Sequence, residues 1–214
     1  MPMRSFESVV PSELWSTIQR GTLQTRYRGR LFLKSPFDAI LYLQLIQQLR
    51  PRTIIEIGSK EGGSALWFAD MLMLHGIEAR VLTIDRQTPE LVDPRITLLQ
   101  GDANDLHAVL PDSLLRTLPH PFLISEDSAH TLETSLAVLH FFDRHLLTGD
   151  RIVIEDGVVD FLPESLYCQY ENGPNRAVAD FLKNSGDRYA IDHAFCDYFG
   201  TNVTYNPNGW LRRV

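Results

Sequence analysis

The sequence predicts an α/β domain in which helices cover both faces of a mostly parallel, doubly wound sheet. Short and nearly uninterrupted apolar runs alternate with helical patterns between residues 52 and 156, as expected of strands that are covered on both faces. A glycine-rich segment follows the first of these runs directly, which is typical of a tight turn from a strand into a helix. The chain has 214 residues and 44% hydrophobic side chains, enough for one domain with a sizeable core.

Residues 1–50 are expected to form a helical extension to the main domain, which spans residues 51–214. Two helical segments precede the first strand. The second begins at Ser35 and Pro36, where serine suits the cap position and proline the first helical position. Its apolar residues recur at helical spacing until Leu49, and Pro51 marks its end. Such an extension would suit a homo-oligomer.

Five apolar runs are the expected parallel strands, at residues 53–57, 79–84, 96–99, 122–125 and 151–154. The helical patterns between and after them cover residues 63–74, 104–116 and 130–147. Residues 157–173 show neither pattern, and an irregular segment of that length is typical of a lid or binding loop. A helix over residues 174–183 and two β-like segments near 188–194 and 201–205 predict an antiparallel C-terminal strand pair.

Charge and composition exclude several classes of protein. The formal net charge is −7, which argues against a nucleic-acid or anionic-membrane surface. The nearest approach to a basic patch comprises Arg26, Arg28, Arg30 and Lys34, which we interpret as a solvated or phosphate-facing loop edge. The two cysteines form no disulfide framework. No secretion signal and no apolar run of about 18 residues is present, so we expect a cytoplasmic protein.

The glycine-rich segment IIEIGSKEGGSALWFA narrows the choice of ligand. Gly58 and Gly62 permit a tight turn and a close approach of the backbone to a ligand at a helix N-terminus. A dinucleotide site would need a glycine where Lys60 stands, and a P-loop would need a lysine directly after Gly63. The pattern left after these two kinds of site are excluded is Glu56, then Gly58, then Gly62 four residues later. Asp85 ends the second predicted strand about 20 residues later, where an acid meets a ribose hydroxyl in Rossmann-type folds.

Carboxylates also follow the fourth and fifth predicted strands. Glu126, Asp127 and His130 follow the fourth, and Glu155 and Asp156 follow the fifth. The carboxyl ends of parallel strands meet at one edge of a sheet, so these acids should converge. Carboxylates that converge repel one another unless a cation compensates them, and oxygen ligands favour Mg²⁺, Mn²⁺ or Ca²⁺. Alternatively, the aspartates cap the segments that follow them.

Six segments together resemble the cephalosporin hydroxylase family: KSPFD (34–38), EIGSKEGGSALWFA (56–69), DSAH (127–130), IVIEDG (152–157), GPNRAVADFL (173–182) and YNPNGWLRR (205–213). That family groups with the class I methyltransferases that use S-adenosylmethionine, and it is similar to macrolide-sugar and rhamnosyl O-methyltransferases. The resemblance implies a Rossmann-like fold and methyl transfer to a hydroxyl group of a small-molecule acceptor, such as a sugar or natural-product scaffold.

The resemblance also implies roles for individual residues. Asp127, Glu155 and Asp156 would hold Mg²⁺ or another hard divalent cation, with Asp127 and His130 catalytic and His130 the general base. Whether Glu126 adds a ligand stays open. The residues expected to bind S-adenosylmethionine are Glu56, Gly58, Ser59, Gly62, Ser64, Asp85, Arg86, Gly101 and Asp102. Two alternatives remain: metal-independent methylation of a small molecule, and a catalytically silent cofactor-binding partner of another biosynthetic enzyme.

Overall fold

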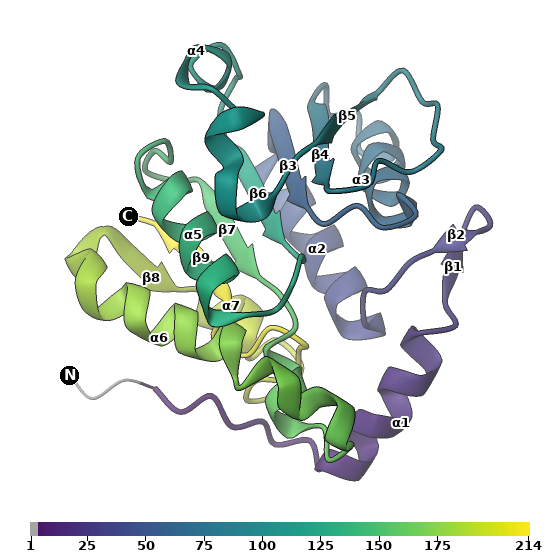
Figure 1. The fold of residues 1–214 in the computed structure, drawn as a ribbon, viewed down its shortest axis with the longest axis vertical. Coiled ribbons are helices and arrows are strands. Elements are labelled where there is room, and N and C mark those ends of the chain that lie inside the picture. Colours follow the sequence, from purple (N-terminus) through teal and green to yellow (C-terminus); the bar gives the residue numbers. More distant parts are fainter. Residues whose placement is uncertain (1–3) are drawn as a thin grey trace.

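A computed structural model describes residues 4–214; residues 1–3, the start of the predicted extension, lie outside the described part. Its centre is a seven-stranded sheet with the order β5-β4-β3-β6-β7-β9-β8 (Figure 1). The strands are β3 (Thr53–Ile57), β4 (Arg80–Asp85), β5 (Ile96–Gln100), β6 (Phe122–Glu126), β7 (Arg151–Ile154), β8 (Tyr189–Ile191) and β9 (Trp210–Arg213). The first five pair in parallel, and β9 pairs antiparallel with both β7 and β8. This confirms the predicted fold class.

Helices cover both faces of the sheet (Figure 1). On one face, α2 (Pro36–Leu49) and α3 (Gly63–Leu74) pack on apolar side chains such as Ile54 and Val81. On the other, α5 (Leu132–Asp143) and α6 (Gly173–Ser185) pack on Ile55, Ile124 and others. Burial on both sides explains why the parallel strands consist of nearly continuous apolar residues. None of the helices within residues 4–214 is both long and apolar enough to cross a lipid bilayer.

The N-terminal segment contains α1 (Ser12–Thr22). It also contains a hairpin of β1 (Arg26–Tyr27) and β2 (Arg30–Leu31), and the sequence did not predict this hairpin. The hairpin packs on the start of α3, where a Cβ on Gly63 would lie 2.0 Å from the carbonyl oxygen of Leu31. The predicted cap of α2 is confirmed, since the backbone N–H of Asp38 donates to the Ser35 hydroxyl at 3.0 Å. The division of the chain at residue 50 stays a prediction.

Two predicted elements are wrong. Residues 104–116 form two short helices, η1 (Ala103–Ala108) and α4 (Asp112–Leu115). Pro111 precedes α4, and a proline inside a longer helix would remove a hydrogen bond and clash with the preceding turn. Residues 201–205 form turns and bends, because the side-chain oxygens of the buried residues Asn202 and Thr204 accept from the nearby backbone N–H groups of Asn208 and Asn206. The strand that pairs with β8 is β9.

The segment after β7 contains two 3₁₀ helices, η2 (Gly157–Phe161) and η3 (Ser165–Tyr170). The remaining short elements are η4 (Gly186–Arg188) and α7 (His193–Cys196). Within η2, the Asp160 carboxylate accepts a hydrogen bond from the Asn175 side chain at 2.5 Å, and burial raises the pKa of Asp160 to about 6.

Asp160→Asn should raise the melting temperature more at pH 8 than at pH 5. Because the folded-state pKa of Asp160 lies above its ordinary value, this group favours folding at low pH, and that contribution is lost as the pH rises through about 6. Partial exposure weakens the effect, so we expect a gain of about 2–4 °C at pH 8. Calorimetric scans at both pH values measure it, and equal gains would contradict burial of the charge as the cause.

Candidate active site

A cavity of about 620 Å³ lies beyond the carboxyl ends of the parallel strands. The cavity lies near β3, from which the strands that follow in sequence are added first on one side (β4, β5) and then on the other (β6, β7). Doubly wound sheets bind ligands at such a point. The structure brings most of the predicted site residues together there. The predicted residues that line the cavity are Gly58, Ser59, Ser64, Asp85, Arg86, Gly101, Asp102, Asp127, His130 and Asp156.

Gly58 joins the glycine loop to the segment after β6. Its φ is +102°, and a Cβ at this position would lie 2.0 Å from the carbonyl oxygen of Asp127. Only glycine meets both conditions, since other residues rarely adopt this backbone conformation and their side chain would collide with the carbonyl. Gly62 also has a positive φ, +79°, and occupies the N-cap position of α3. The close approach therefore fixes the glycine loop against the segment that carries Asp127.

Glu56 lies beneath the glycine loop, and neither it nor Gly62 is among the cavity-lining residues. Burial raises the pKa of Glu56, whose Oε2 accepts a hydrogen bond from the Thr83 hydroxyl at 2.6 Å. The Thr83 hydroxyl lies 2.6 Å from that of Ser59, and since Thr83 donates to Glu56, Ser59 donates to Thr83. In this structure Glu56 supports the loop through Thr83 and Ser59.

Asp85 is the last residue of β4, Asp102 follows β5, and both line the cavity. The two carboxylate oxygens of Asp85 accept from the backbone N–H groups of Lys60 and Gln87, at 2.9 and 3.1 Å. The Asp102 carboxylate accepts from the backbone N–H of Asn104 at 2.9 Å. Bonds to the backbone hold both carboxylates in place without using all their acceptor capacity, so they can still accept from ligand hydroxyl or amino groups.

Asp127, His130 and Asp156 form a cluster in which one ligand atom from each lies within 4.8 Å of the others. His130 Nε2 lies 3.4 Å from Asp156 Oδ2, and His130 Nδ1 is buried without a hydrogen-bond partner among residues 4–214. Burial raises the pKa of Asp156 to about 6. The two carboxylates supply the oxygen ligands that a hard divalent cation prefers, with the His130 imidazole beside them.

The backbone of this cluster is held in an unusual conformation. His130 and Asp156 have φ values of +55° and +59°, a left-handed conformation that costs such residues about 1–3 kcal/mol. Neighbouring segments hold it there. A Cβ on Gly173 would lie 2.5 Å from the His130 carbonyl oxygen, and the backbone N–H of Asp156 donates to the Asn206 side chain at 3.0 Å. The late Gly-Pro and Asn-Pro-x-Gly motifs thus contact the acidic cluster directly.

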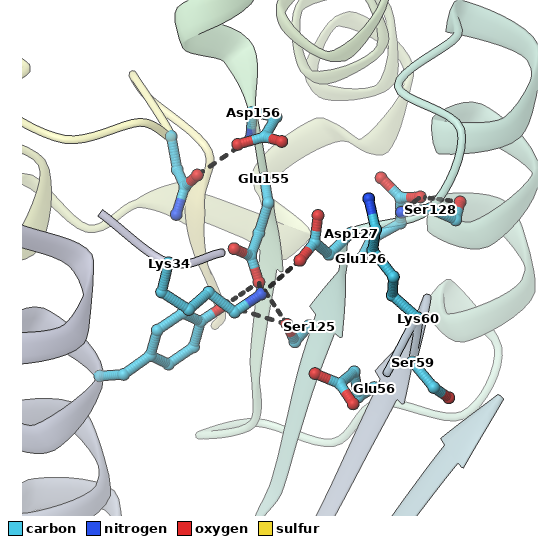
Figure 2. Close-up of polar contacts among 12 residues, drawn as sticks. Lys34, Glu56, Ser59, Lys60, Ser125, Glu126, Asp127, Ser128, Glu155 and Asp156 are labelled. Carbon is cyan, nitrogen blue, oxygen red and sulfur yellow. Dashed lines mark hydrogen bonds and ion pairs between the residues drawn. The ribbon is translucent and has the colours of Figure 1, made fainter. Parts of the chain in front are cut away.

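Glu155, the third predicted metal ligand, is outside this cluster and outside the cavity lining, and a lysine holds its carboxylate. Its Oε1 accepts from Lys34 Nζ at 2.7 Å, from the Tyr42 hydroxyl at 2.7 Å, and from the Ser125 hydroxyl. Lys34 Nζ also donates to Asp127 Oδ2 at 2.6 Å (Figure 2). Burial raises the pKa of Glu155, against the opposing effect of Lys34. Burial lowers the pKa of Lys34, but the carboxylates of Asp127 and Glu155 outweigh it and raise that pKa overall.

The interpretation of Lys34 as part of a solvated loop edge is therefore wrong. Its side chain is only 2% exposed, because the chain turns inward at Lys34 before Ser35 caps α2. The spacing of the basic residues between positions 26 and 34 gives no reason to expect that Lys34, and not its arginine neighbours, is buried. The feature of the sequence that could have indicated burial of Lys34 is its position directly before the capped helix, in the KSPFD segment.

Glu126 faces away from the cluster (Figure 2). Its Oε1 accepts from the backbone N–H of Ser128 at 3.2 Å and from the Ser128 hydroxyl, and its Oε2 accepts from the Ser135 hydroxyl at 3.0 Å. Burial raises the pKa of Glu126. In this structure Glu126 therefore braces the turn between β6 and α5.

Comparisons with known proteins agree with this arrangement. The family described as rhamnosyl O-methyltransferase/CmcI matches residues 19–214 of the chain. The rhamnosyl O-methyltransferase of Mycobacterium leprae is 29% identical over 195 residues, which cover 88% of this chain and 83% of that protein. The protein of the same name from Mycobacterium tuberculosis H37Rv is 28% identical over 197 residues, which cover 89% and 78%.

Solved structures resemble the whole chain. An apo structure of CmcI superposes with a TM-score of 0.71 and 28% identity, covering 100% of this chain and 88% of that one. A structure of CmcI described as holding Mg and SAM superposes with a TM-score of 0.69 and 27% identity, covering 100% and 89%. The chain belongs to the rhamnosyl O-methyltransferase/CmcI family of S-adenosylmethionine-dependent methyltransferases.

Proposed function

We propose that this protein transfers the methyl group of S-adenosylmethionine to a hydroxyl group of a sugar, or of a natural-product scaffold, with the help of a divalent cation such as Mg²⁺. One observation carries the proposal. The same cavity is lined both by Gly58, Asp85 and their neighbours and by Asp127, His130 and Asp156. A cofactor methyl group and an acceptor hydroxyl can therefore meet in a single space.

The cofactor would occupy the end of the cavity next to the glycine loop. Asp85 lies where a carboxylate can accept hydrogen bonds from both ribose hydroxyls. Ser59, Ser64, Arg86, Gly101 and Asp102 would complete its surroundings, with Glu56 and Gly62 acting through the shape of the loop. The description of a CmcI structure with Mg and SAM supports this assignment.

The cation would be held by Asp127, Asp156 and the second oxygen of Glu155, because Glu155 Oε1 is already bound by three donors. When bound, such an ion would supply Lewis-acid chemistry that lowers the pKa of an acceptor hydroxyl. In the transfer itself, the hydroxyl oxygen bonds to the methyl carbon, the carbon–sulfur bond breaks, and its electron pair stays on sulfur. The hydroxyl proton passes to His130, which faces the cavity.

Methyl transfer from radiolabelled S-adenosylmethionine to a panel of rhamnosides and other glycosides, with Mg²⁺ present, tests this function. We expect label in an O-methyl product of at least one glycoside. If calorimetry shows S-adenosylhomocysteine binding while no acceptor is labelled, the protein is a silent cofactor-binding partner. Label found only on amine or carboxylate acceptors would favour metal-independent methylation instead.

His130→Gln should lower the rate of methyl transfer by about 10²–10⁴-fold, the usual contribution of a general base. Affinity for S-adenosylhomocysteine and for Mn²⁺ should change little, because glutamine retains a polar group without an imidazole base. Initial rates and calorimetry measure both effects, with His140→Gln, an exposed position on α5, as the control. A selective loss of Mn²⁺ binding would make His130 a ligand and would refute its role as the base.

We also infer a reducing, cytoplasmic location, since Cys168 and Cys196 are both free thiols.

A further inference from the structure

Lys34 lies between two of the acids that the proposed function assigns to the cation (Figure 2). Its Nζ is 2.6 Å from Asp127 Oδ2 and 2.7 Å from Glu155 Oε1, and 2% of its side chain is exposed. The two acids come from different strand ends, after β6 and β7, whereas Lys34 comes from the segment before α2. One ammonium therefore joins three parts of the chain at the cavity.

The contacts with Lys34 involve one oxygen of the Asp127 carboxylate and one of the Glu155 carboxylate, and the second oxygen of each makes no such contact. Among the described residues, every hydrogen bond to the Glu155 carboxylate goes to Oε1, from Lys34, Tyr42 and Ser125. The side-chain hydrogen bond to Asp127 within the same part of the chain goes to Oδ2. Glu155 Oε2 and Asp127 Oδ1 therefore keep their acceptor capacity. These are the oxygens with which the two residues can bind a cation.

The segment that carries Lys34 is itself anchored. The next residue, Ser35, caps α2 through the backbone N–H of Asp38. The Asp38 carboxylate is buried and accepts from the backbone N–H of Tyr205 at 2.9 Å and from the Thr204 hydroxyl. Because its segment is anchored, Lys34 can hold its partner carboxylates in a fixed direction. A solvent-exposed lysine is a weaker partner, since pairing costs it the conformational freedom of its side chain.

We propose that Lys34 is a positioning residue, which grips one oxygen of Asp127 and one of Glu155 and so presents their other oxygens to the divalent cation. The inference rests on the proposed function, because it requires the cation site. Residues that orient metal ligands in this way contribute about 10–100-fold to metal affinity. The ammonium also offsets the repulsion between the carboxylates of Asp127 and Glu155, which would otherwise turn them apart.

Lys34→Met tests the proposal, since methionine is close to lysine in length and carries no charge. Calorimetric titration with Mn²⁺ should show affinity about 10–100-fold below that of the unchanged protein. Affinity for S-adenosylhomocysteine should stay within about threefold, because Lys34 does not line the cavity; this readout separates a lost cation site from a damaged fold. Tyr42→Phe is the matched control. It removes a neutral donor from the same Glu155 oxygen, and should weaken Mn²⁺ binding by about threefold or less.

Mn²⁺ binding by Lys34→Met that equals or exceeds that of the unchanged protein would overturn the proposal, because the ammonium would then be a bystander or a competitor of the cation. If Lys34→Met fails to fold, Lys34→Gln carries the same expectations. Failure of the unchanged protein to bind Mn²⁺ would overturn the proposed cation site itself, so the two failures are distinguishable.

Discussion

Gly58→Ala should destabilise the protein by about 4 kcal/mol and abolish binding of S-adenosylhomocysteine. Two costs add at this position. Alanine is strained at a φ of +102°, which costs about 1–3 kcal/mol. Its Cβ would also lie 2.0 Å from the Asp127 carbonyl oxygen, and pushing packed atoms apart costs a similar amount. Because the obstacle is backbone, relief requires the segment after β6 to move, and the cavity wall moves with it.

Urea unfolding and calorimetric titration with S-adenosylhomocysteine measure the two effects. Gly76→Ala is the matched control, since Gly76 has a φ of +58° and a Cβ there would meet nothing within 4 Å. It should cost about 1 kcal/mol from backbone strain alone and leave cofactor binding intact. Equal stability losses in the two variants would contradict the close approach of Gly58 to Asp127.

Asp127→Asn should reduce methyl transfer by about 10³-fold, which corresponds to several kcal/mol of transition-state stabilisation. Asp127 lies at the junction of the site: its carboxylate bonds to Lys34 and belongs to the cluster with His130 and Asp156. Asparagine keeps the shape of the side chain but removes the charge that a cation requires. It also leaves Lys34 with a single carboxylate partner.

Initial rates and Mn²⁺ titration measure the effect of Asp127→Asn, and affinity for S-adenosylhomocysteine should change little. Asp105→Asn, at an exposed position outside the cavity lining, is the control for removing a carboxylate and should retain full activity. Full methyl transfer by Asp127→Asn would refute a catalytic role for this residue.

The parallel strands of the sheet could be predicted from sequence because each of them has a recognisable local pattern. Each parallel strand is a short apolar run, and each turn after it carries the polar residues that face the cavity. Asp85, Asp102 and Asp127 could thus be assigned to one edge without knowledge of any contact. The C-terminal region could not be predicted in this way. Val203 and Thr204 have the composition of a strand, but buried side-chain hydrogen bonds hold residues 201–206 in turns.

The contacts of Lys34 could not be predicted from sequence patterns, for a different reason. Its partners Asp127 and Glu155 lie far along the chain, and a basic residue among arginines is ordinarily solvated. Only the tertiary fold shows that this ammonium is buried between two acids. The same holds for Glu126: the sequence left open whether it adds a ligand, and in the structure its oxygens bond to Ser128 and Ser135.

Cation-assisted methyl transfer is tested most directly by the rate of glycoside methylation after treatment with EDTA. We expect the rate to fall to background, because Asp127, Glu155 and Asp156 would lose the ion that we propose they hold, and added Mg²⁺ to restore it. A rate unaffected by both EDTA and Mg²⁺ would contradict the claim and assign these acids a structural role.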